Sequence, residues 1–317
     1  MLSVNLLCSR SRKIFSFLVC LVIILIFVEY AVAFKTENVF LVIIDGVRYS
    51  ETFGDETHVN IPNMYLLSSK GCINTTFYND KRTNTLNGVN AILTGKWTKF
   101  TTNKVFWFFQ KSALFPKDPS IWEYYRKQLN LPQGSSYYSF PYSEEGSFQP
   151  VSHHKEYGPD YWPMRGELEI VMRIHHPKLV VLYLGETDGA GHNGDWEKYL
   201  QAIKTTDEIV DKLWSKIQSD PIYQNKTTLF VTNDHGRHDD SHGGFRNHGD
   251  ACQGCQHIMF LAIGPDFKKN YQTNTRQTLI DITPTIGKLL GFNPEYSKGK
   301  IMSELFTDTP IPDQQND

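Results

Sequence analysis

The chain contains 317 residues, of which 40% are hydrophobic and 21% are charged, and its formal net charge at pH 7 is -2. These values are typical of a globular protein with one large α/β domain, with or without an inserted segment, and they exclude extensive disorder. The balanced charge gives no support for nucleic-acid binding, which generally requires a clustered excess of basic residues.

Residues 1–33 have the pattern of an export leader. Basic residues between 10 and 13 precede an apolar run at 14–28, and the sequence A-V-A at 31–33 is typical of a signal peptidase cleavage site. We therefore favour a cleaved signal peptide over the alternative, a membrane anchor formed by residues 14–33, which are enough to span a bilayer once. Either interpretation places the rest of the chain outside the cytoplasm, as a secreted, periplasmic or outward-facing anchored protein.

Three apolar runs after the leader are predicted to be buried parallel strands, because they are almost continuous in β-branched and other apolar residues. They comprise residues 38–44, 179–184 and 228–232. Each run leads toward an acidic residue, which is Asp45, Asp188 or Asp234. A buried carboxylate costs free energy unless it is paired or bound to a metal, and ligands of open α/β sheets bind at the carboxyl ends of the strands. The repetition therefore predicts a site where these ends meet.

Helical patterns separate these strands along the chain. Helices are predicted at residues 61–70, 85–95, 120–129, 165–174, 195–219 and 279–290, and further strands at 76–78 and 257–263. Alternating strands and helices predict an α/β domain over residues 34–317, with a mainly parallel central sheet and helices on both faces. The aromatic-rich stretch at 97–162 interrupts the alternation, and we interpret it as a small inserted cap, formed either for its own packing or to contact substrate.

Carboxylate and imidazole groups follow the predicted strand ends and are candidate metal ligands. They belong to Asp45, Asp188, His192, Asp234, His235 and His248. A mixed set of oxygen and nitrogen donors favours zinc or a similar ion over calcium or magnesium. The set is too large for one tetrahedral ion and fits two. Two ions about 4 Å apart can stabilise the attacking and the leaving oxygen of a displacement at phosphorus.

The order and spacing of these motifs resemble the alkaline phosphatase superfamily and, within it, the type I phosphodiesterase/nucleotide pyrophosphatase branch. The matching segments are D-G-V-R at 45–48, T-L-N-G-V-N-A-I-L-T-G at 85–95, D-G-A-G-H at 188–192, D-H-G at 234–236, N-H-G-D at 247–250, L-A-I-G-P-D-F at 261–267 and D-I-T-P-T-I-G-K-L-L-G at 281–291. They occur in the family's order and cover nearly all of the chain after the leader. The resemblance implies an alkaline phosphatase-like fold.

The resemblance also implies two sets of metal ligands and a nucleophile. One set is Asp45, Asp234 and His235, and the other is Asp188, His192 and His248. Thr85 would contact the first ion and attack phosphorus, forming a phosphothreonyl intermediate that water then hydrolyses. Metal coordination favours the alkoxide of a threonine, and the N-terminus of a helix adds positive potential for the phosphoryl group. Thr85 could at the same time cap this helix.

Two positions near Thr85 depart from the family's pattern. Proline is frequent two residues after the nucleophile, where this chain has Asn87, and the phosphodiesterase branch usually has asparagine one residue later, where this chain has Gly88. Asn87 is therefore a weak candidate to bind a phosphate oxygen. Sulfatases resemble this superfamily but require C/S-x-P-x-R at the nucleophile, and Thr85 without such an arginine argues against a sulfatase.

Cysteine, histidine and arginine residues outside these sets leave alternatives open. Cys252 and Cys255 form a C-x-x-C sequence that could bind metal or form a disulfide, and we favour the disulfide because a single C-x-x-C is weak evidence for zinc in an exported chain. His238 and His242 match no ligand position and are expected at the surface or beside the ligands. The candidates to contact phosphate, with ordinary salt bridges as the alternative, are Arg48, Arg82 and Arg237.

We therefore expect an exported two-zinc hydrolase of phosphoric esters, acting on a small-molecule or lipid-linked phosphate ester. A phosphodiesterase is favoured over a phosphomonoesterase, because the latter must neutralise a further charged oxygen. The alternatives are a phosphomonoesterase or a phospho-group transferase of the same superfamily, and a metal-binding protein without catalysis. The presence of Thr85 counts against the last of these.

Overall fold

The computed structural model describes residues 34–104, 112–139 and 167–307. The leader at 1–33, with its predicted signal peptide or anchor, lies outside the described residues. Within the described ranges, no helix is both long enough and apolar enough to cross a membrane.

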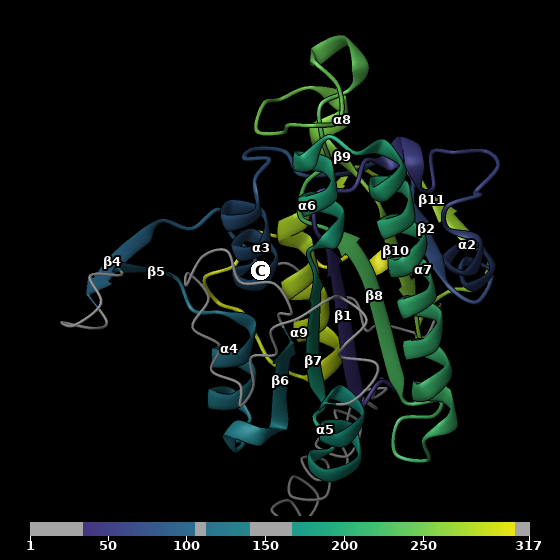
Figure 1. Ribbon diagram of the computed structural model, residues 1–317. Coiled ribbons are helices and arrows are strands. Elements are labelled where there is room, and N and C mark those ends of the chain that lie inside the picture. The colour runs from purple at the N-terminus through teal and green to yellow at the C-terminus, as the bar shows by residue number, and fades with distance from the viewer. Residues whose placement is uncertain (1–33, 105–111, 140–166, 308–317) are drawn as a thin grey trace, which may run out of the picture. The chain divides into compact units, whose positions relative to one another are not determined.

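A seven-stranded sheet forms the centre of the fold, in the order β11-β2-β10-β8-β1-β7-β6 (Figure 1). Its strands are β1 (Asn38–Ile44), β2 (Cys72–Asn74), β6 (Ser136–Ser139), β7 (Leu179–Leu184), β8 (Thr227–Asn233), β10 (Phe260–Ile263) and β11 (Tyr271–Thr273). β1 lies between β7 and β8 and is parallel to both, whereas β10 runs antiparallel to its neighbours β8 and β2. The predicted mainly parallel α/β sheet is therefore confirmed, with one strand reversed.

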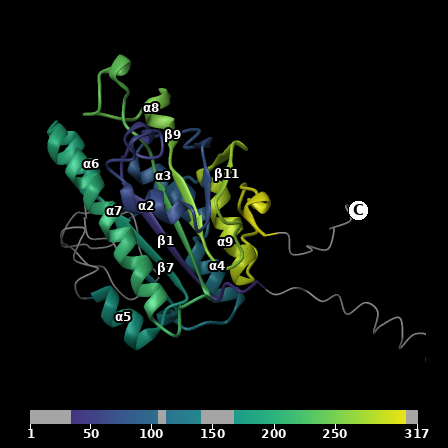
Figure 2. The same cartoon turned by 90° about the vertical axis from the view of Figure 1, so that its right-hand side faces the viewer.

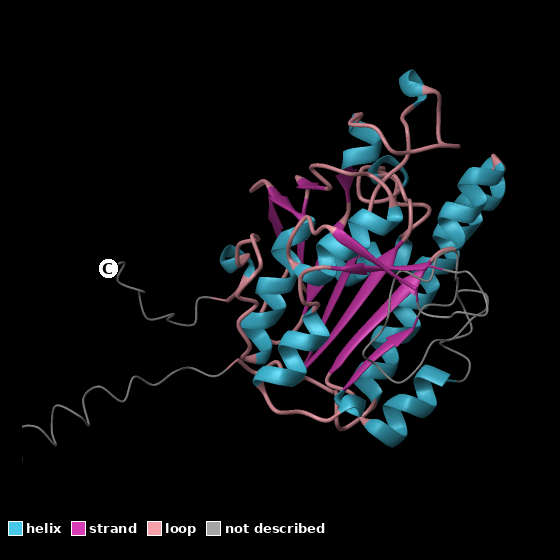
Figure 3. Ribbon diagram, turned by 90° about the vertical axis from the view of Figure 1, so that its left-hand side faces the viewer, coloured by secondary structure: helices cyan, strands magenta, loops and turns pink. Residues whose placement is uncertain are grey.

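Helices cover both faces of this sheet (Figures 2 and 3). One face packs against α2 (Pro62–Ser68), α5 (Glu167–His175) and α7 (Trp196–Ser219), and the other against α3 (Thr85–Thr94), α4 (Ile121–Gln128) and α9 (Ile282–Leu290). The side chains of β1 alternate between these two cores, since Val39 and Leu41 enter one and Phe40 and Val42 the other. All four are buried, which explains the continuous apolar run in the sequence.

The remaining elements are short. They are β3 (Phe77–Tyr78), β4 (Phe100–Lys104), β5 (Ser112–Pro116), α6 (Glu186–Asn193), α8 (Gln253–Gln256), β9 (His257–Ile258), β12 (Gln277–Thr278) and five single turns of 3-10 helix (Tyr49–Glu51, Gln133–Ser135, Asp240–His242, Leu279–Asp281 and Ser303–Leu305). β12, β3 and β9 form a second sheet. The strand predicted at 257–263 is therefore divided between two sheets.

The structure describes residues 97–104 and 112–139 of the stretch that we interpret as a cap insertion, residues 97–162. β4 and β5 form a separate antiparallel hairpin, which extends away from the central sheet in Figure 1. By contrast, β6 is a strand of the central sheet and α4 packs into the core below it. Trp122 of α4 and Tyr138 of β6 are buried, with ring centroids 5.0 Å apart. These two aromatic residues thus lie in the core of the domain, and residues 140–166 of the stretch lie outside the described part.

Candidate metal centre

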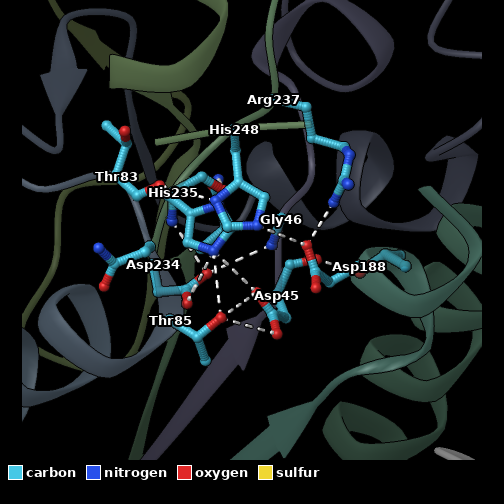
Figure 4. Close-up of polar contacts among 12 residues, drawn as sticks. Asp45, Gly46, Thr83, Thr85, Asp188, Asp234, His235, Arg237 and His248 are labelled. Atoms are coloured by element: carbon cyan, nitrogen blue, oxygen red, sulfur yellow. Dashed lines mark hydrogen bonds and ion pairs between the residues drawn. The ribbon is translucent and has the colours of Figure 1, made fainter. Parts of the chain in front are cut away.

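The three carboxylates predicted to meet do so because their strands are neighbours. Ile44, the last residue of β1, pairs with Leu184 of β7 and with Asn233 of β8. Asp45 and Asp234 follow their strands directly. Asp188 lies in the first turn of α6, which begins two residues after β7 ends. All three therefore reach one end of the sheet (Figure 4).

A glycine makes this convergence possible. Gly46 has a φ of +62°, and a Cβ at this position would lie 2.6 Å from Oδ1 of Asp188. The D-G sequence after β1 thus turns the chain sharply and leaves space for a carboxylate from the neighbouring strand connection. Two hydroxyls support Asp45 itself: that of Tyr183 donates to its carboxylate, and that of Thr187 donates to its backbone carbonyl.

Asp45 and His235 surround the hydroxyl of Thr85 (Figure 4). Oγ1 of Thr85 lies 3.4 Å from both carboxylate oxygens of Asp45 and 3.3 Å from Nε2 of His235. Nδ1 of His235 donates to the carbonyl of Gly236 at 2.8 Å, so Nε2 is the nitrogen that faces the site. Although burial favours the neutral ring, Asp234 and Asp45 raise the pKa of His235 to about 10.

The surroundings of the Asp234 carboxylate indicate that these residues can bind a metal ion. Its side chain is fully buried, and Oδ1 accepts from the backbone N–H groups of His235 at 2.9 Å and Gly46 at 3.3 Å. Oδ2 is buried without a hydrogen bond in the described structure and lies 3.6 Å from Nε2 of His235. Burial, and then Asp45, raise the pKa of Asp234 well above its ordinary value. A buried carboxylate oxygen without a donor is costly, and a cation would satisfy it.

Asp188, His192 and His248 form the second half of the centre. Asp188 and His192 are four residues apart on α6 and therefore share a face, with Oδ2 and Nε2 3.2 Å apart. Nε2 of His248 lies 3.0 Å from Nε2 of His192 and 3.5 Å from Oδ1 of Asp188. Nδ1 of His248 donates to the carbonyl of Thr83 at 2.9 Å, which directs Nε2 to the cluster. Burial, and then His235, lower the pKa of His248 to about 3.

The two halves adjoin each other. Asp45, Asp188 and His235 have ligand atoms within 4.8 Å of one another, as do Asp188, His192 and His248. The rings of His235 and His248 are stacked with centroids 4.0 Å apart. All six predicted ligands thus lie in one cluster, whose imidazole and carboxylate donors suit a pair of divalent ions such as zinc.

Arg237 holds Asp188 in place, a role that the sequence did not indicate. Its guanidinium is fully buried, donates to Oδ1 of Asp188, and donates to the carbonyls of Phe245 and, at 2.8 Å, Arg246. A Cβ on Gly191 would contact this guanidinium, so α6 packs directly on it. Although burial raises the pKa of Asp188, its contacts with His192, His235 and Arg237 hold that pKa below its ordinary value.

Arg48 and Arg82, the other two candidates to contact phosphate, have different hydrogen-bond partners. Arg48 is also engaged structurally, since it pairs with Glu51 at 2.7 Å and with Asp240 at 3.2 Å. Arg82 instead donates to Oδ1 of Asn87 at 3.3 Å, in an exposed position next to the first turn of α3. Ordinary ion pairs thus account for Arg48 and Arg237, and Arg82 lies beside the turn that carries Thr85.

The N-terminus of α3 positions Thr85 and explains the departures from the family pattern. Asn84 caps the helix by accepting from the N–H of Asn87 at 3.1 Å, so Thr85 is the first helical residue rather than the cap. The Asn87 amide also donates to Asn84 at 2.8 Å, which leaves its second N–H as the donor that could contact a phosphate oxygen. A Cβ on Gly88 would lie 2.5 Å from the carbonyl oxygen of Asp234, so an asparagine there would not fit.

The cysteines and the unmatched histidines lie outside these six donors. Cys72, Cys252 and Cys255 are free thiols, so the disulfide favoured from the sequence is not formed. His238 and His242 cluster with the C-x-x-C cysteines and nearby carboxylates rather than with Asp45 or Asp188.

Comparison with known proteins agrees with this fold. Residues 163–294 match a family described as the metalloenzyme superfamily. A 2,3-bisphosphoglycerate-independent phosphoglycerate mutase of Legionella pneumophila (strain Lens) is 26% identical over 116 residues, which are 37% of this chain and 21% of that protein. The chain thus spans only about a fifth of the length of this curated relative.

Solved structures resemble most of the chain. Murine ectonucleotide pyrophosphatase/phosphodiesterase 5 superposes with a TM-score of 0.59 at 15% identity, covering 85% of this chain and 100% of that chain. A 2-O GAG sulfatase superposes with a TM-score of 0.65 at 14% identity, covering 84% of this chain and 73% of that chain. At such identities the likeness concerns the fold, which is alkaline phosphatase-like. Residues 163–294 are thus similar to the metalloenzyme superfamily, and the described chain has an alkaline phosphatase-like fold.

Proposed function

We propose that the protein is a phosphodiesterase that uses Thr85 as its nucleophile and binds two divalent ions, most plausibly zinc. This proposal rests on the position of the Thr85 hydroxyl, which lies in the first turn of α3 and 3.3–3.4 Å from Nε2 of His235 and the Asp45 carboxylate. The ions would be held by the two sets of ligands, Asp45, Asp234 and His235 on one side and Asp188, His192 and His248 on the other. When bound, they supply Lewis-acid stabilisation of the reacting oxygens.

The chain's own residues orient the reaction. The N-terminus of α3 offers backbone N–H groups and a positive dipole end to the phosphoryl oxygens. Thr85 Oγ1 forms a bond to phosphorus as the bond to the first alcohol breaks, and the hydroxyl proton ends on that alcohol. Water then attacks the phosphothreonine, which restores the Thr85 hydroxyl and releases a phosphomonoester. His235 and His248 are kept in the tautomers with a free Nε2 by their bonds to Gly236 and Thr83.

A pocket beside the N-terminal part of α3 supports a diester substrate. It has a volume of about 340 Å³ and is lined by Lys81, Arg82, Asn87, Trp97, Lys99 and Phe100. Asn87 is two residues from Thr85 on α3, so the pocket adjoins the helix that carries the proposed nucleophile. Trp97 and Phe100 offer apolar surface, and within the described residues no carboxylate pairs with the three basic side chains. Such a pocket suits a second ester group that combines an organic part with negative charge.

A phospho-group transferase is the second candidate. The similarity to phosphoglycerate mutases over about a third of the chain favours it, because those relatives are named for moving a phosphate group. Addition of an alcohol acceptor such as glycerol separates the two functions. A hydrolase releases the phosphate group mainly to water, whereas a transferase gives mainly the glycerol ester. The leader supports a further part of the proposal, that the protein acts outside the cytoplasm on a soluble or lipid-linked ester.

Turnover of three esters tests the proposed activity. We expect the zinc-loaded protein to hydrolyse bis-p-nitrophenyl phosphate faster than p-nitrophenyl phosphate, and p-nitrophenyl sulfate not at all. Thr85→Ala should lower diester turnover about a thousandfold or more while retaining its metal ions. Thr205→Ala, on the outer side of α7, is the matched control and should leave the rate unchanged. Bound zinc without turnover of any ester would refute the enzyme assignment, and faster monoester turnover would refute the diesterase.

A further inference from the structure

A second cluster of metal-ligand side chains lies apart from the six donors of the catalytic centre. A ring nitrogen of His238, a carboxylate oxygen of Asp250 and Sγ of Cys255 lie within 4.8 Å of one another. The thiol of Cys252 contacts both Cys255 and Asp250, and the thiol of Cys255 also contacts Asp250. One imidazole, one carboxylate and one thiol therefore lie close together, and the thiol of Cys252 contacts two of these three groups.

His238 is oriented as metal-binding histidines usually are. Its Nδ1 donates to the carbonyl of His242 at 2.7 Å, which leaves Nε2 with a lone pair. Nε2 is buried and forms no hydrogen bond among the described residues, and its nearest ionic neighbour is Oδ2 of Asp250 at 3.6 Å. A buried ring nitrogen without a hydrogen-bond partner costs free energy. A cation bound between this nitrogen, the carboxylate and the thiols would remove that cost.

The two cysteines would bring the number of candidate donors to four. Both are buried free thiols, and α8 separates them by one helical turn, with Cys252 as its N-cap. C-x-x-C spacing places two thiolates on one ion in many structural zinc sites, where a histidine and another donor complete the four ligands. Thiolate ligands select zinc over calcium and magnesium. We propose that His238, Asp250, Cys252 and Cys255 bind one structural zinc ion, in addition to the ions of the catalytic centre.

The neighbouring pair of Asp239 and His242 is less suited to this ion. These residues lie near Cys252, but Nδ1 of His242 already bonds Oδ1 of Asp239 at 2.7 Å, and the side chain of His242 is half exposed. Their mutual pairing satisfies both groups, whereas Nε2 of His238 has no such partner.

The position of this site suggests what the ion does. His238 follows His235 by three residues, and Asp250 follows His248 by two. The ion would therefore fasten the beginning and the end of the segment 236–250 to α8, and so fix the spacing of two ligands that belong to different halves of the catalytic centre. Two backbone hydrogen bonds already connect these segments. His238 N–H donates to the Asn247 carbonyl at 2.8 Å, and Gly236 N–H donates to the Cys255 carbonyl at 2.8 Å.

Cobalt spectroscopy tests the site without reference to activity. The six catalytic donors include no sulfur, so a sulfur-to-cobalt charge-transfer band in the near ultraviolet reports cysteine ligands and not the catalytic centre. We expect the full-length protein, purified under reducing conditions and loaded with Co²⁺, to show the band. Cys252→Ser and Cys255→Ser should each lose it together with about one zinc ion per chain. His248→Ala, at the catalytic centre, should keep it, which separates this inference from the proposed function.

Cys72→Ser is the matched control. Cys72 is also a buried free thiol, but it donates to the carbonyls of Lys268 and Leu305 instead of joining the cluster. This variant should retain the band and the zinc. The spectrum of the unmodified protein decides the question even where a cysteine variant does not fold. Absence of the band from the reduced protein, or an intact mass showing that Cys252 and Cys255 form a disulfide in the freshly isolated protein, would overturn the proposal.

Discussion

The hydroxyl of Thr85 lies 3.3 Å from Nε2 of His235, although the two residues are 150 positions apart in the chain. Their contact depends on the close approach of α3 to the end of β8. Gly88 permits this approach, because a side chain there would collide with the backbone of Asp234. The same packing sets the distance between Thr85, the proposed nucleophile, and the proposed metal ligands Asp45 and His235, so small changes in α3 should have large effects on the proposed catalysis.

Replacement of Gly88 tests this packing. Gly88→Ala should displace α3 from β8, lower the free energy of unfolding by about 1–3 kcal/mol and lower kcat strongly. Gly189→Ala is the matched control, since nothing lies within 4 Å of a Cβ at that helical position. Denaturant unfolding and diester turnover measure both effects. Equal stability and activity of the two variants would show that α3 does not pack as described.

Replacement of Arg237 tests how Asp188 is positioned. Arg237→Met keeps a long side chain but removes the donor to Asp188, so the pKa of Asp188 should rise and the affinity for one metal ion should fall about 10–100-fold. Titration of the metal-free protein with zinc measures this affinity. Arg276→Met, which loses only a contact with the ring of Tyr78, should bind zinc normally. Unchanged affinity in Arg237→Met would contradict the assigned role.

Metal removal should make stability depend on pH above neutrality. In the metal-free protein, burial and then Asp45 raise the pKa of Asp234, and Asp234 and Asp45 raise that of His235 to about 10 despite burial. A raised folded-state pKa contributes stability that is present below the unfolded pKa and is lost as pH rises through the folded pKa. The free energy of unfolding should therefore fall between about pH 7 and pH 10. His248, with its pKa lowered to about 3, stays neutral throughout.

Denaturant unfolding with a chelator at several pH values measures this effect. Zinc should remove most of the pH dependence, because bound ions replace the proton on His235 and neutralise Asp234. Asp234→Asn should also reduce it, as the amide cannot titrate. A metal-free protein that becomes more stable as the solution is made alkaline would contradict the electrostatic description of the centre.

The basic pocket beside α3 should affect substrate binding more than chemistry. Arg82→Ala should raise KM about tenfold for a diester whose second group is anionic, the loss expected for one charge-assisted hydrogen bond, with little change in kcat. A diester with a neutral second group should show no such effect. Lys198→Ala, an exposed lysine paired with Asp195, is the charge-matched control. An equal KM effect on both substrates would exclude charge recognition in this pocket.

Much of this fold follows from patterns that the sequence displays directly. Parallel strands buried on both faces are continuous apolar runs, so β1, β7 and β8 could be predicted within a residue or two of their ends. The acidic residues after them could be predicted for the same reason. Residues 186–193 could not be predicted to be a helix, because the two glycines of D-G-A-G-H lower helix propensity.

Other features depend on contacts between distant segments. Aromatic residues such as Trp122 and Tyr138 are common both in a protein core and in a cap, so composition does not distinguish the two. The pairing of β6 with β7 is what shows that Tyr138 belongs to the central sheet, where it contacts Trp122. The sequence around Arg237 does not distinguish it from an exposed loop residue, and only the structure shows that it is buried against Asp188. Similarly, a single C-x-x-C favours a disulfide over a metal site, and the sequence alone does not show that His238 lies near Cys255.

A covalent phosphothreonine at position 85 would test the central claim most directly. The zinc-loaded protein should be mixed with bis-p-nitrophenyl phosphate, quenched in acid during turnover and digested for mass spectrometry. We predict a p-nitrophenyl phosphate adduct on Thr85 in the unmodified protein and none in Thr85→Ala, with the same metal content in both. Full diester turnover by Thr85→Ala, or an adduct on another residue, would contradict the assignment of Thr85 as the nucleophile.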